Sequence, residues 1–181
     1  MYQLIAPDAQ AFTQWSACLE ECGDGPIDGS GFQATPDLSE AAFSLYMEDR
    51  LRAADTSIAP PENWVHCNFY WIVDGAGTGE LVGFLALRHE LTPHLLEQGG
   101  HIGYSVRPSA RNKGVASAAL VLGLTEARNL GIGRVLLTVQ ESNVASQRVI
   151  ERAGGVYEDS RQGFRRYWFP QPNPWGQDSH S

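Results

Sequence analysis

The residues best suited to bind an anion lie in the stretch VRPSARNKGVA, which runs from Val106 to Ala116. A helical pattern begins directly after it, and the first N–H groups of a helix have no intrahelical partners and carry about half a positive elementary charge. Gly114 lacks a Cβ and lets a phosphate approach the backbone, while Arg111 and Lys113 add positive charge at the same turn. The stretch therefore predicts a diphosphate site. The alternative is that both charges are solvated and Gly114 only makes a turn.

Groups able to accept a proton precede this stretch in two runs. His89 and Glu90 lie near the end of LVGFLALRHEL, and His101 and Tyr104 belong to HIGYSV. Imidazole titrates near neutral pH, so the two histidines are suited to general base catalysis. The competing interpretation is a hydrogen-bonded structural role at a strand end. Arg88 is suited either to a substrate carboxylate or to an ion pair with one of the protein's own acids.

The three cysteines do not form a metal-binding pattern. Cys18 and Cys22 are four residues apart on an expected helix, and Cys67 stands alone. A structural zinc site needs four ligands, and a disulfide framework needs an even number of cysteines. We expect reduced, partly buried thiols and no metal.

The groups above must be positioned by strands and helices, which we predict from hydrophobic periodicity and from glycine and proline signals. A strand over 2–7 and a helix over 9–22 precede a glycine-rich loop. A second helix begins near Thr35, with Leu38, Ala42 and Leu45 on its expected buried face. Further strands are expected over 65–74, 81–91, 101–106, 134–140, 156–159 and 164–169, and further helices over 114–129 and 143–153.

This order of elements predicts an α/β fold. A mainly antiparallel first half is joined to a strand–helix–strand–helix–strand second half, giving one mixed sheet with helices on both faces. We expect a single domain over 1–170, divided into a variable N-terminal part (1–64) and a core (65–170), and a loose surface tail over 171–181. The loops and helix between 23 and 61 are an expected place for substrate-selecting surface.

The charge balance limits the classes of partner. The 181 residues carry 21 acidic and 13 basic side chains, a formal net charge of -8. This balance disfavours binding to nucleic acid or to an anionic membrane surface and favours a cationic substrate. The N-terminal residues resemble no export signal, and no run of 18 apolar residues is long enough to span a bilayer. We therefore expect a cytoplasmic protein.

The stretch 106–116 resembles the V-x-P-x-x-[RQ]-x-x-G-x-[GA] signature of the GNAT superfamily of acyl-CoA-dependent N-acyltransferases, and it matches every fixed position. The run LLTVQESNVASQRVIERAGG is similar to the family's next segment, a strand followed by an Asn-x-x-Ser/Ala helix that ends in glycine. The runs RHEL, GGHIGYSVRPS and VIERAGG resemble a bacterial subgroup of acetyltransferases without a settled substrate. The similarity extends from about Leu81 to Phe169.

The resemblance implies a mostly antiparallel sheet splayed at its central strands and acetyl-CoA as acyl donor. It implies that Ser105 and Val106 bond the pantetheine arm and that Asn143 and Ser146 contact it from the other side of the opening. Asn143 equally suits a helix N-cap. The residues implied to wrap the CoA pyrophosphate through their backbone are Arg111, Asn112, Lys113, Gly114, Val115 and Ala116.

The sequence departs from the family at one catalytic position. Many members have a tyrosine seven residues after the asparagine, as the acid that protonates the leaving thiolate, whereas this chain has Ile150. Tyr157 and Tyr167 are nearby substitutes, although each equally suits strand packing. For the base, the resemblance points to the region of His89, His101 and Tyr104. We place His89 first, with Tyr104 as an orienting or relaying hydroxyl.

We therefore expect an N-acetyltransferase that moves an acetyl group from acetyl-CoA to a primary amine of a small molecule by direct attack in a ternary complex. Two alternatives stay open. One is a non-catalytic acetyl-CoA sensor, and the other is an acetyltransferase acting on protein N-termini or lysines. A homodimer is compatible with all three.

Overall fold

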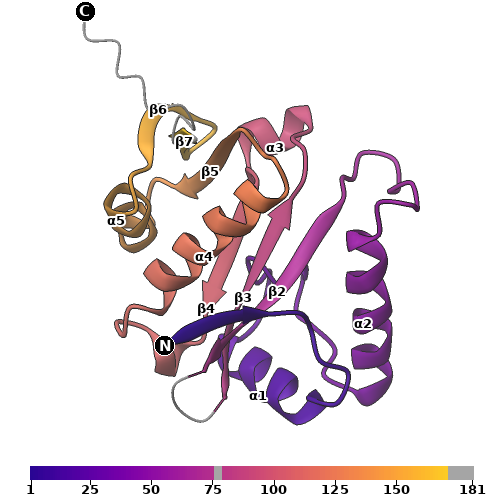
Figure 1. Cartoon of the computed structure of the whole chain (residues 1–181). Coiled ribbons are helices and arrows are strands. Elements are labelled where there is room, and N and C mark those ends of the chain that lie inside the picture. Colours follow the sequence, from indigo (N-terminus) through magenta and orange to yellow (C-terminus); the bar gives the residue numbers. More distant parts are fainter. Residues whose placement is uncertain (76–78, 171–181) are drawn as a thin grey trace, which may run out of the picture.

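The computed structural model describes residues 1–75 and 79–170 (Figure 1). The tail predicted over 171–181 lies outside the described residues. Strands and helices occur in the predicted order along the described chain, with two short additions. These are the helix α3 (Pro93–Glu97), which follows the N-cap Thr92, and the 3-10 helix η1 (Pro108–Ala110).

The first sheet contains four antiparallel strands in the order β1-β2-β3-β4. They are β1 (Tyr2–Ile5), β2 (Cys67–Asp74), β3 (Leu81–Arg88) and β4 (Ile102–Val106). The consecutive strands β2 and β3 pair antiparallel, with Trp71 opposite Phe84 in their register. Strand β4 is an edge strand of this sheet: it pairs with β3 on one side, and in the described chain no strand forms a ladder with its other edge.

The second sheet contains three antiparallel strands in the order β5-β7-β6. They are β5 (Arg134–Gln140), β6 (Val156–Arg161) and β7 (Phe164–Pro170). In the described part of the chain, β4 and β5 share no ladder, and they meet at His101, whose N–H donates to the Leu136 oxygen at 2.8 Å. The α/β class with mostly antiparallel strands is thus confirmed. The predicted single mixed sheet is wrong, because the strands separate between β4 and β5 and the described ladders form two antiparallel sheets.

Helices cover both faces of the first sheet. Helix α4 (Val115–Asn129) crosses in front of β3 and β4 (Figure 1) and packs with Leu85, Leu87 and Ile102. The opposite face carries Phe84, which packs in a second cluster with residues of α1 (Phe12–Cys22) and α2 (Glu40–Ala54). Strand β3 is buried on both faces, which explains why its sequence is an almost continuous apolar run.

The predicted buried face of α2 is wrong. The helix buries Phe43, Tyr46 and Met47, whereas Leu45 is 63% exposed. The aromatic side chains set the rotation of the helix, because Phe43 and Tyr46 pack against Trp15 with ring centroids 5.0 and 5.5 Å apart. Burying these larger rings removes more apolar surface from water than burying the small Ala42 side chain.

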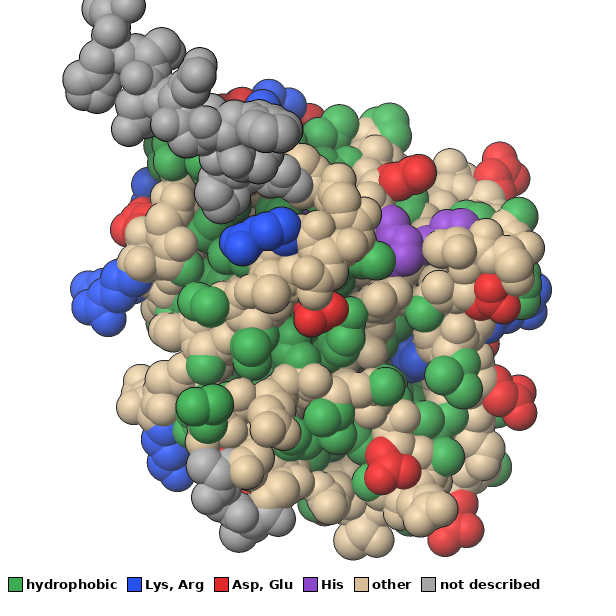
Figure 2. Space-filling model, viewed as in Figure 1, with side chains coloured by type: hydrophobic (Ala, Val, Ile, Leu, Met, Phe, Trp, Pro, Cys, Tyr) green, Lys and Arg blue, Asp and Glu red, His purple; other side chains and the backbone are tan. Residues whose placement is uncertain are grey.

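The described surface shows no concentration of one charge on the face drawn in Figure 2. Acidic and basic side chains are scattered there, and hydrophobic side chains gather in the middle of the face, over α4. None of the helices in the described ranges is long and apolar enough to cross a bilayer.

Candidate active site

The turn after β4 has the backbone geometry that the sequence predicts for an anion site. Residues Pro108–Ala110 form a single 3-10 turn, and Gly114 then occupies the N-cap of α4 in the left-handed conformation, with φ +79°. No side chain caps this helix, and a Cβ added to Gly114 would meet nothing within 4 Å. The first N–H groups of α4 therefore have no capping side chain, and the N-cap residue before them leaves the space at its own Cβ position open.

A network of charged side chains braces this turn from α1. Glu21 accepts hydrogen bonds from the Ser109 N–H, from the Ser109 hydroxyl at 3.0 Å and from Arg107 Nε at 2.5 Å. Arg107 also bonds Glu80 at 2.6 Å. Burial opposes ionisation of Glu21, but the hydrogen bonds outweigh it and lower the pKa of this carboxyl. No sequence pattern predicts this brace, because Glu21 and Ser109 are 88 residues apart.

The residues predicted to bind the pyrophosphate all lie at this turn or at the start of α4. Their side chains differ in contacts and exposure. Arg111 Nε donates to the Val106 oxygen at 3.0 Å, so this side chain fastens the turn to the end of β4. The Lys113 oxygen accepts from the Tyr2 hydroxyl at 3.3 Å. Arg111, Asn112 and Lys113 are exposed, and Val115 is buried.

Two hydroxyl groups on β4 are buried. Ser105 Oγ has no hydrogen-bond partner among the described residues, and Tyr104 Oη makes no hydrogen bond of normal geometry there, although the Ser146 side chain lies close enough to affect it. Buried polar atoms in proteins are nearly always bonded, so such hydroxyls suit a site that a polar ligand completes. As consecutive residues of β4, Tyr104 and Ser105 point to opposite faces of the strand. Burial raises the pKa of Tyr104, and Ser146 of α5 (Val144–Arg152) lowers it in part, which places β4 and α5 close together at the opening. Acetyl-CoA fits these groups.

Asn143 is the N-cap of α5, as one of the two predicted interpretations requires. Its Oδ1 accepts from the Ser146 N–H at 3.1 Å. This bond does not exclude a contact with the pantetheine arm, because the amide nitrogen of Asn143 makes no hydrogen bond within the described chain. The ligand role of Asn143 and Ser146 therefore stays a prediction.

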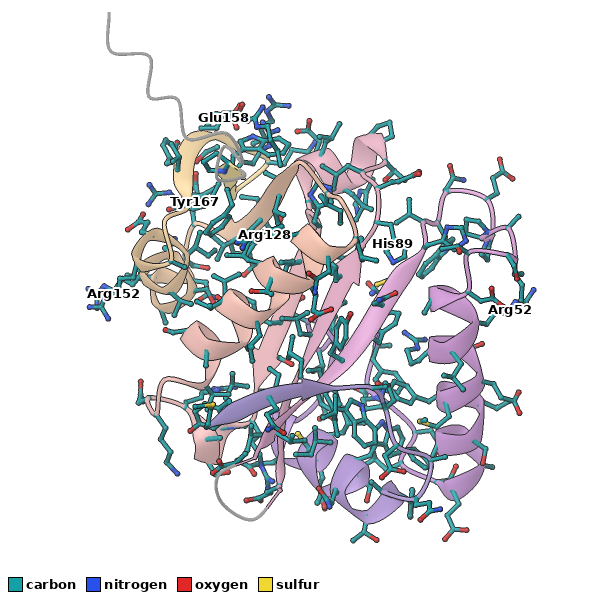
Figure 3. The ribbon with its side chains drawn as sticks, in the orientation of Figure 1. Arg52, His89, Arg128, Arg152, Glu158 and Tyr167 are labelled. Atoms are coloured by element: carbon teal, nitrogen blue, oxygen red, sulfur yellow. The ribbon has the colours of Figure 1, made fainter. Side chains whose placement is uncertain are left out.

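The two candidate histidines lie in different places. His101 is 6% exposed and joins the two sheets, since its Nδ1 accepts from the Leu136 N–H at 2.9 Å. Burial and the charge of Arg88 lower the pKa of His101 to about 4, so the ring is neutral at pH 7 and weakly basic. His89 Nε2 contacts Asn68 Oδ1 of β2 at 3.0 Å, so its ring is directed to the far side of β3 from β4. Figure 3 shows His89 beside β2, away from Tyr167.

The side chains of Ile150, Tyr157 and Tyr167 each make contacts with other residues of the protein. Ile150 is 1% exposed and belongs to the core under α4. The Tyr167 hydroxyl donates to Glu151 at 2.8 Å, and the Tyr157 hydroxyl shares a hydrogen bond with Ser160. Arg88 Nη1 donates to the Gly99 and Gly100 oxygens at 3.2 Å each, which ties this side chain to the backbone. Tyr104 is thus the predicted catalytic residue that the fold brings to the opening.

The family profile of the acetyltransferase (GNAT) domain matches residues 8–156, which is most of the chain. The chain belongs to the GNAT acetyltransferase family. A comparison with curated protein sequences finds no significant match. In this GNAT protein no three histidine, cysteine, aspartate or glutamate residues of the described ranges lie together as a metal site.

Solved structures share the fold at low sequence identity. Mycobacterium smegmatis RimJ in complex with CoA-disulfide has a TM-score of 0.70 at 18% identity, covering 94% of this chain and 82% of that one. A proposed ribosomal-protein-serine acetyltransferase from Vibrio cholerae has a TM-score of 0.64 at 14% identity, covering 93% of both chains. The spermidine/spermine N-acetyltransferase SpeG from Vibrio cholerae has a TM-score of 0.61 at 16% identity, covering 94% of both chains.

Proposed function

We propose that this GNAT protein transfers the acetyl group of acetyl-CoA to a primary amine of a small molecule. The observation that carries the proposal is the uncapped N-terminus of α4 behind the left-handed Gly114, together with the unpartnered Ser105 hydroxyl on the preceding strand β4. A pyrophosphate supplies acceptors for the free N–H groups, and a pantetheine arm supplies polar partners along β4. The free state of Cys18, Cys22 and Cys67 supports a reducing, cytoplasmic location.

In the proposed complex, the backbone from Arg111 to Ala116 binds the pyrophosphate, and Glu21 and Arg107 hold the turn in place. Ser105 and the end of β4 at Val106 bind the pantetheine arm from one side, and Asn143 and Ser146 bind it from the other. The mainly backbone character of the pyrophosphate site is supported by Gly114, whose missing side chain leaves the approach open.

The reaction joins the amine nitrogen to the acetyl carbon and breaks the bond from that carbon to sulfur. The ammonium loses two protons overall: one ends on the sulfur of CoA, and the other is released to water. An alkyl ammonium has a pKa of about 10, so roughly 0.1% is free amine at pH 7 and the site must offset about 4 kcal/mol. Tyr104 is the proposed donor to the leaving sulfur, because burial raises its pKa and keeps the hydroxyl protonated.

Calorimetric titration with acetyl-CoA, followed by a thiol-release screen against small amines and N-terminal peptides, tests this function. We expect saturable binding and CoA release that depends on a small amine. Release with peptides alone would overturn the small-molecule assignment in favour of a protein acetyltransferase.

A non-catalytic acetyl-CoA sensor is the second candidate. The buried Ile150 at the family's tyrosine position and the weakly basic His101 favour it. Binding of acetyl-CoA without release by any amine or peptide would support the sensor and contradict the enzyme.

A further inference from the structure

Arg50, near the end of α2, carries a charge that the fold leaves unpaired. Its Cζ lies 5.1 Å from the ring centroid of Tyr46 and 4.4 Å from that of Phe69, so the guanidinium stacks between α2 and β2. Within the described chain it forms no ion pair and no hydrogen bond, and its Nε is buried without a partner. The side chain is partly exposed. Arg50 is therefore a cation that is held in a fixed place with all of its donors unused.

The loop after α1 closes on this guanidinium. Gly31 has φ +90°, and a Cβ added to it would collide with Arg50 Nη1. A Cβ added to Gly29, two residues earlier, would lie 2.7 Å from the Gly103 oxygen of β4. Two residues of chain span at most about 7 Å. The loop thus places the guanidinium a short distance from the strand that is proposed to bind the donor.

Arg88 of β3 brings a second positive charge to the same face of the sheet. Cys67 of β2 lies opposite Arg88, and Phe69 is two residues further along β2. Alternate residues of a strand share a face, so Phe69 and Arg88 are diagonal neighbours, about 7–8 Å apart. Burial raises the pKa of the Cys67 thiol, and the charges of Arg88 and Arg50 lower it in part, in agreement with this placement.

The protein's own acids do not neutralise the two arginines. Arg88 Nη1 donates to the Gly99 and Gly100 oxygens, which carry no formal charge. Among the described residues no carboxylate, including that of the exposed Asp28, forms an ion pair with either arginine. In a chain of formal net charge -8, two unpaired guanidinium groups on one face of a sheet indicate a local site for an anion.

A purely structural stack is the alternative, because a cation over aromatic rings is favourable by itself. That role accounts for the two rings but leaves every guanidinium donor unbonded, and buried donors without a partner are rare in proteins. A carboxylate completes the group, since the planar guanidinium donates two parallel hydrogen bonds to its two oxygens.

We propose that Arg50, assisted by the charge of Arg88, binds a carboxylate of the acceptor, so that the acceptors are amines that also carry a carboxylate group. This assignment rests on the proposed function and narrows it. The rings of Tyr46 and Phe69 hold the guanidinium in place, and the missing side chain of Gly31 leaves room for Nη1.

Titration of the protein with butyrate, followed by NMR, tests the carboxylate site without acetyl-CoA or turnover. The variants are Arg50→Gln, which removes the charge, and Arg50→Lys, which keeps a charge without the planar donors. Arg52→Gln is the matched control, because Arg52 is exposed on the outer side of α2 (Figure 3). We expect butyrate to shift the Gly31 amide resonance saturably in the wild type and in Arg52→Gln. The affinity should fall at least tenfold in Arg50→Gln and by less in Arg50→Lys, and n-butanol should cause no shift.

Equal affinity of butyrate for the wild type and a folded Arg50→Gln would overturn the proposal, and so would absence of saturable binding to the wild type or an equal shift by n-butanol. Circular dichroism shows whether Arg50→Gln is folded. If it is not, equal affinity of butyrate for Arg50→Lys and the wild type would overturn the proposal.

The role in the reaction is tested by comparing kcat/KM for 4-aminobutyrate with kcat/KM for n-butylamine, an amine of the same chain length without a carboxylate. We expect the wild type and Arg52→Gln to prefer 4-aminobutyrate at least tenfold and Arg50→Gln to lose this preference. No preference in the wild type, or an unchanged preference in Arg50→Gln, would contradict the assignment. Failure of acetyl-CoA to bind, or of every amine to release CoA, would instead contradict the proposed function. The butyrate titration needs neither, so the two failures are distinguishable.

Discussion

The donor side of the opening consists of residues 106–116 with the start of α5, and its proposed contacts come largely from continuous backbone. The acceptor side contains Tyr104 of β4, and its proposed contact is a side chain that the fold brings close to Ser146 of the distant helix α5. A glycine at a helix start and the residues around it are adjacent in sequence, so the donor side has a local signature. The acceptor side has none.

The difference also concerns tolerance to change. A backbone site tolerates replacement of its exposed side chains but not the filling of its open space, whereas a side-chain site depends on single functional groups. Contacts at the donor side should therefore survive changes of the exposed side chains there, whereas a contact at the acceptor side depends on one group such as the Tyr104 hydroxyl. Variants on each side, and at positions assigned to neither, test this division.

The largest expected effect is on stability, at a position that belongs to neither side. Ile150→Ala should lower the free energy of unfolding by about 2–5 kcal/mol, because Ile150 is 1% exposed in the core and a truncated side chain leaves a cavity. Chemical denaturation measures the change. Turnover reduced a hundredfold at unchanged stability would show that position 150 takes part in the chemistry.

His101 should make stability depend on pH. Its pKa falls from 6.5 to about 4 on folding, so between these values the unfolded chain binds a proton that the folded chain does not. The free energy of unfolding should therefore decrease by roughly 3 kcal/mol on lowering the pH through this window. In His101→Asn the amide oxygen can still accept from the Leu136 N–H but does not titrate. Denaturation at several pH values should show this contribution removed; a variant that keeps the full slope would contradict the burial of His101 as its cause.

Tyr104→Phe removes the proposed acid while keeping the ring. We expect kcat to fall about a hundredfold, in the range usual for loss of a general acid, and the acetyl-CoA affinity to stay within about threefold. Tyr157→Phe is the control, because Tyr157 is 46% exposed and its hydroxyl contacts only Ser160. Equal kcat in the two variants would remove Tyr104 from the reaction.

The sequence allows prediction of the order of elements and of the turn at Gly114, because periodicity and local backbone requirements are encoded in neighbouring residues. The splay of the sheet is implied only by the resemblance to the GNAT family. The rotation of α2 could not be predicted, since it depends on Phe43 and Tyr46 packing against Trp15 of another helix. The brace by Glu21 and the close approach of Gly29 to β4 depend on contacts between residues far apart in the chain. The direction of the His89 ring toward Asn68 is likewise a tertiary contact.

Calorimetric titration of acetyl-CoA into the wild type, Gly114→Glu and Gly131→Glu tests the central claim most directly. Both glycines flank α4 with positive φ, and a Cβ added to either would meet open space, so the two substitutions impose similar backbone strain. A carboxylate at 114 would occupy the predicted anion site, and we expect the affinity to fall by about a hundredfold or more, whereas Gly131→Glu should bind like the wild type. Wild-type affinity in a folded Gly114→Glu variant would contradict the assignment of the α4 N-terminus as the donor site.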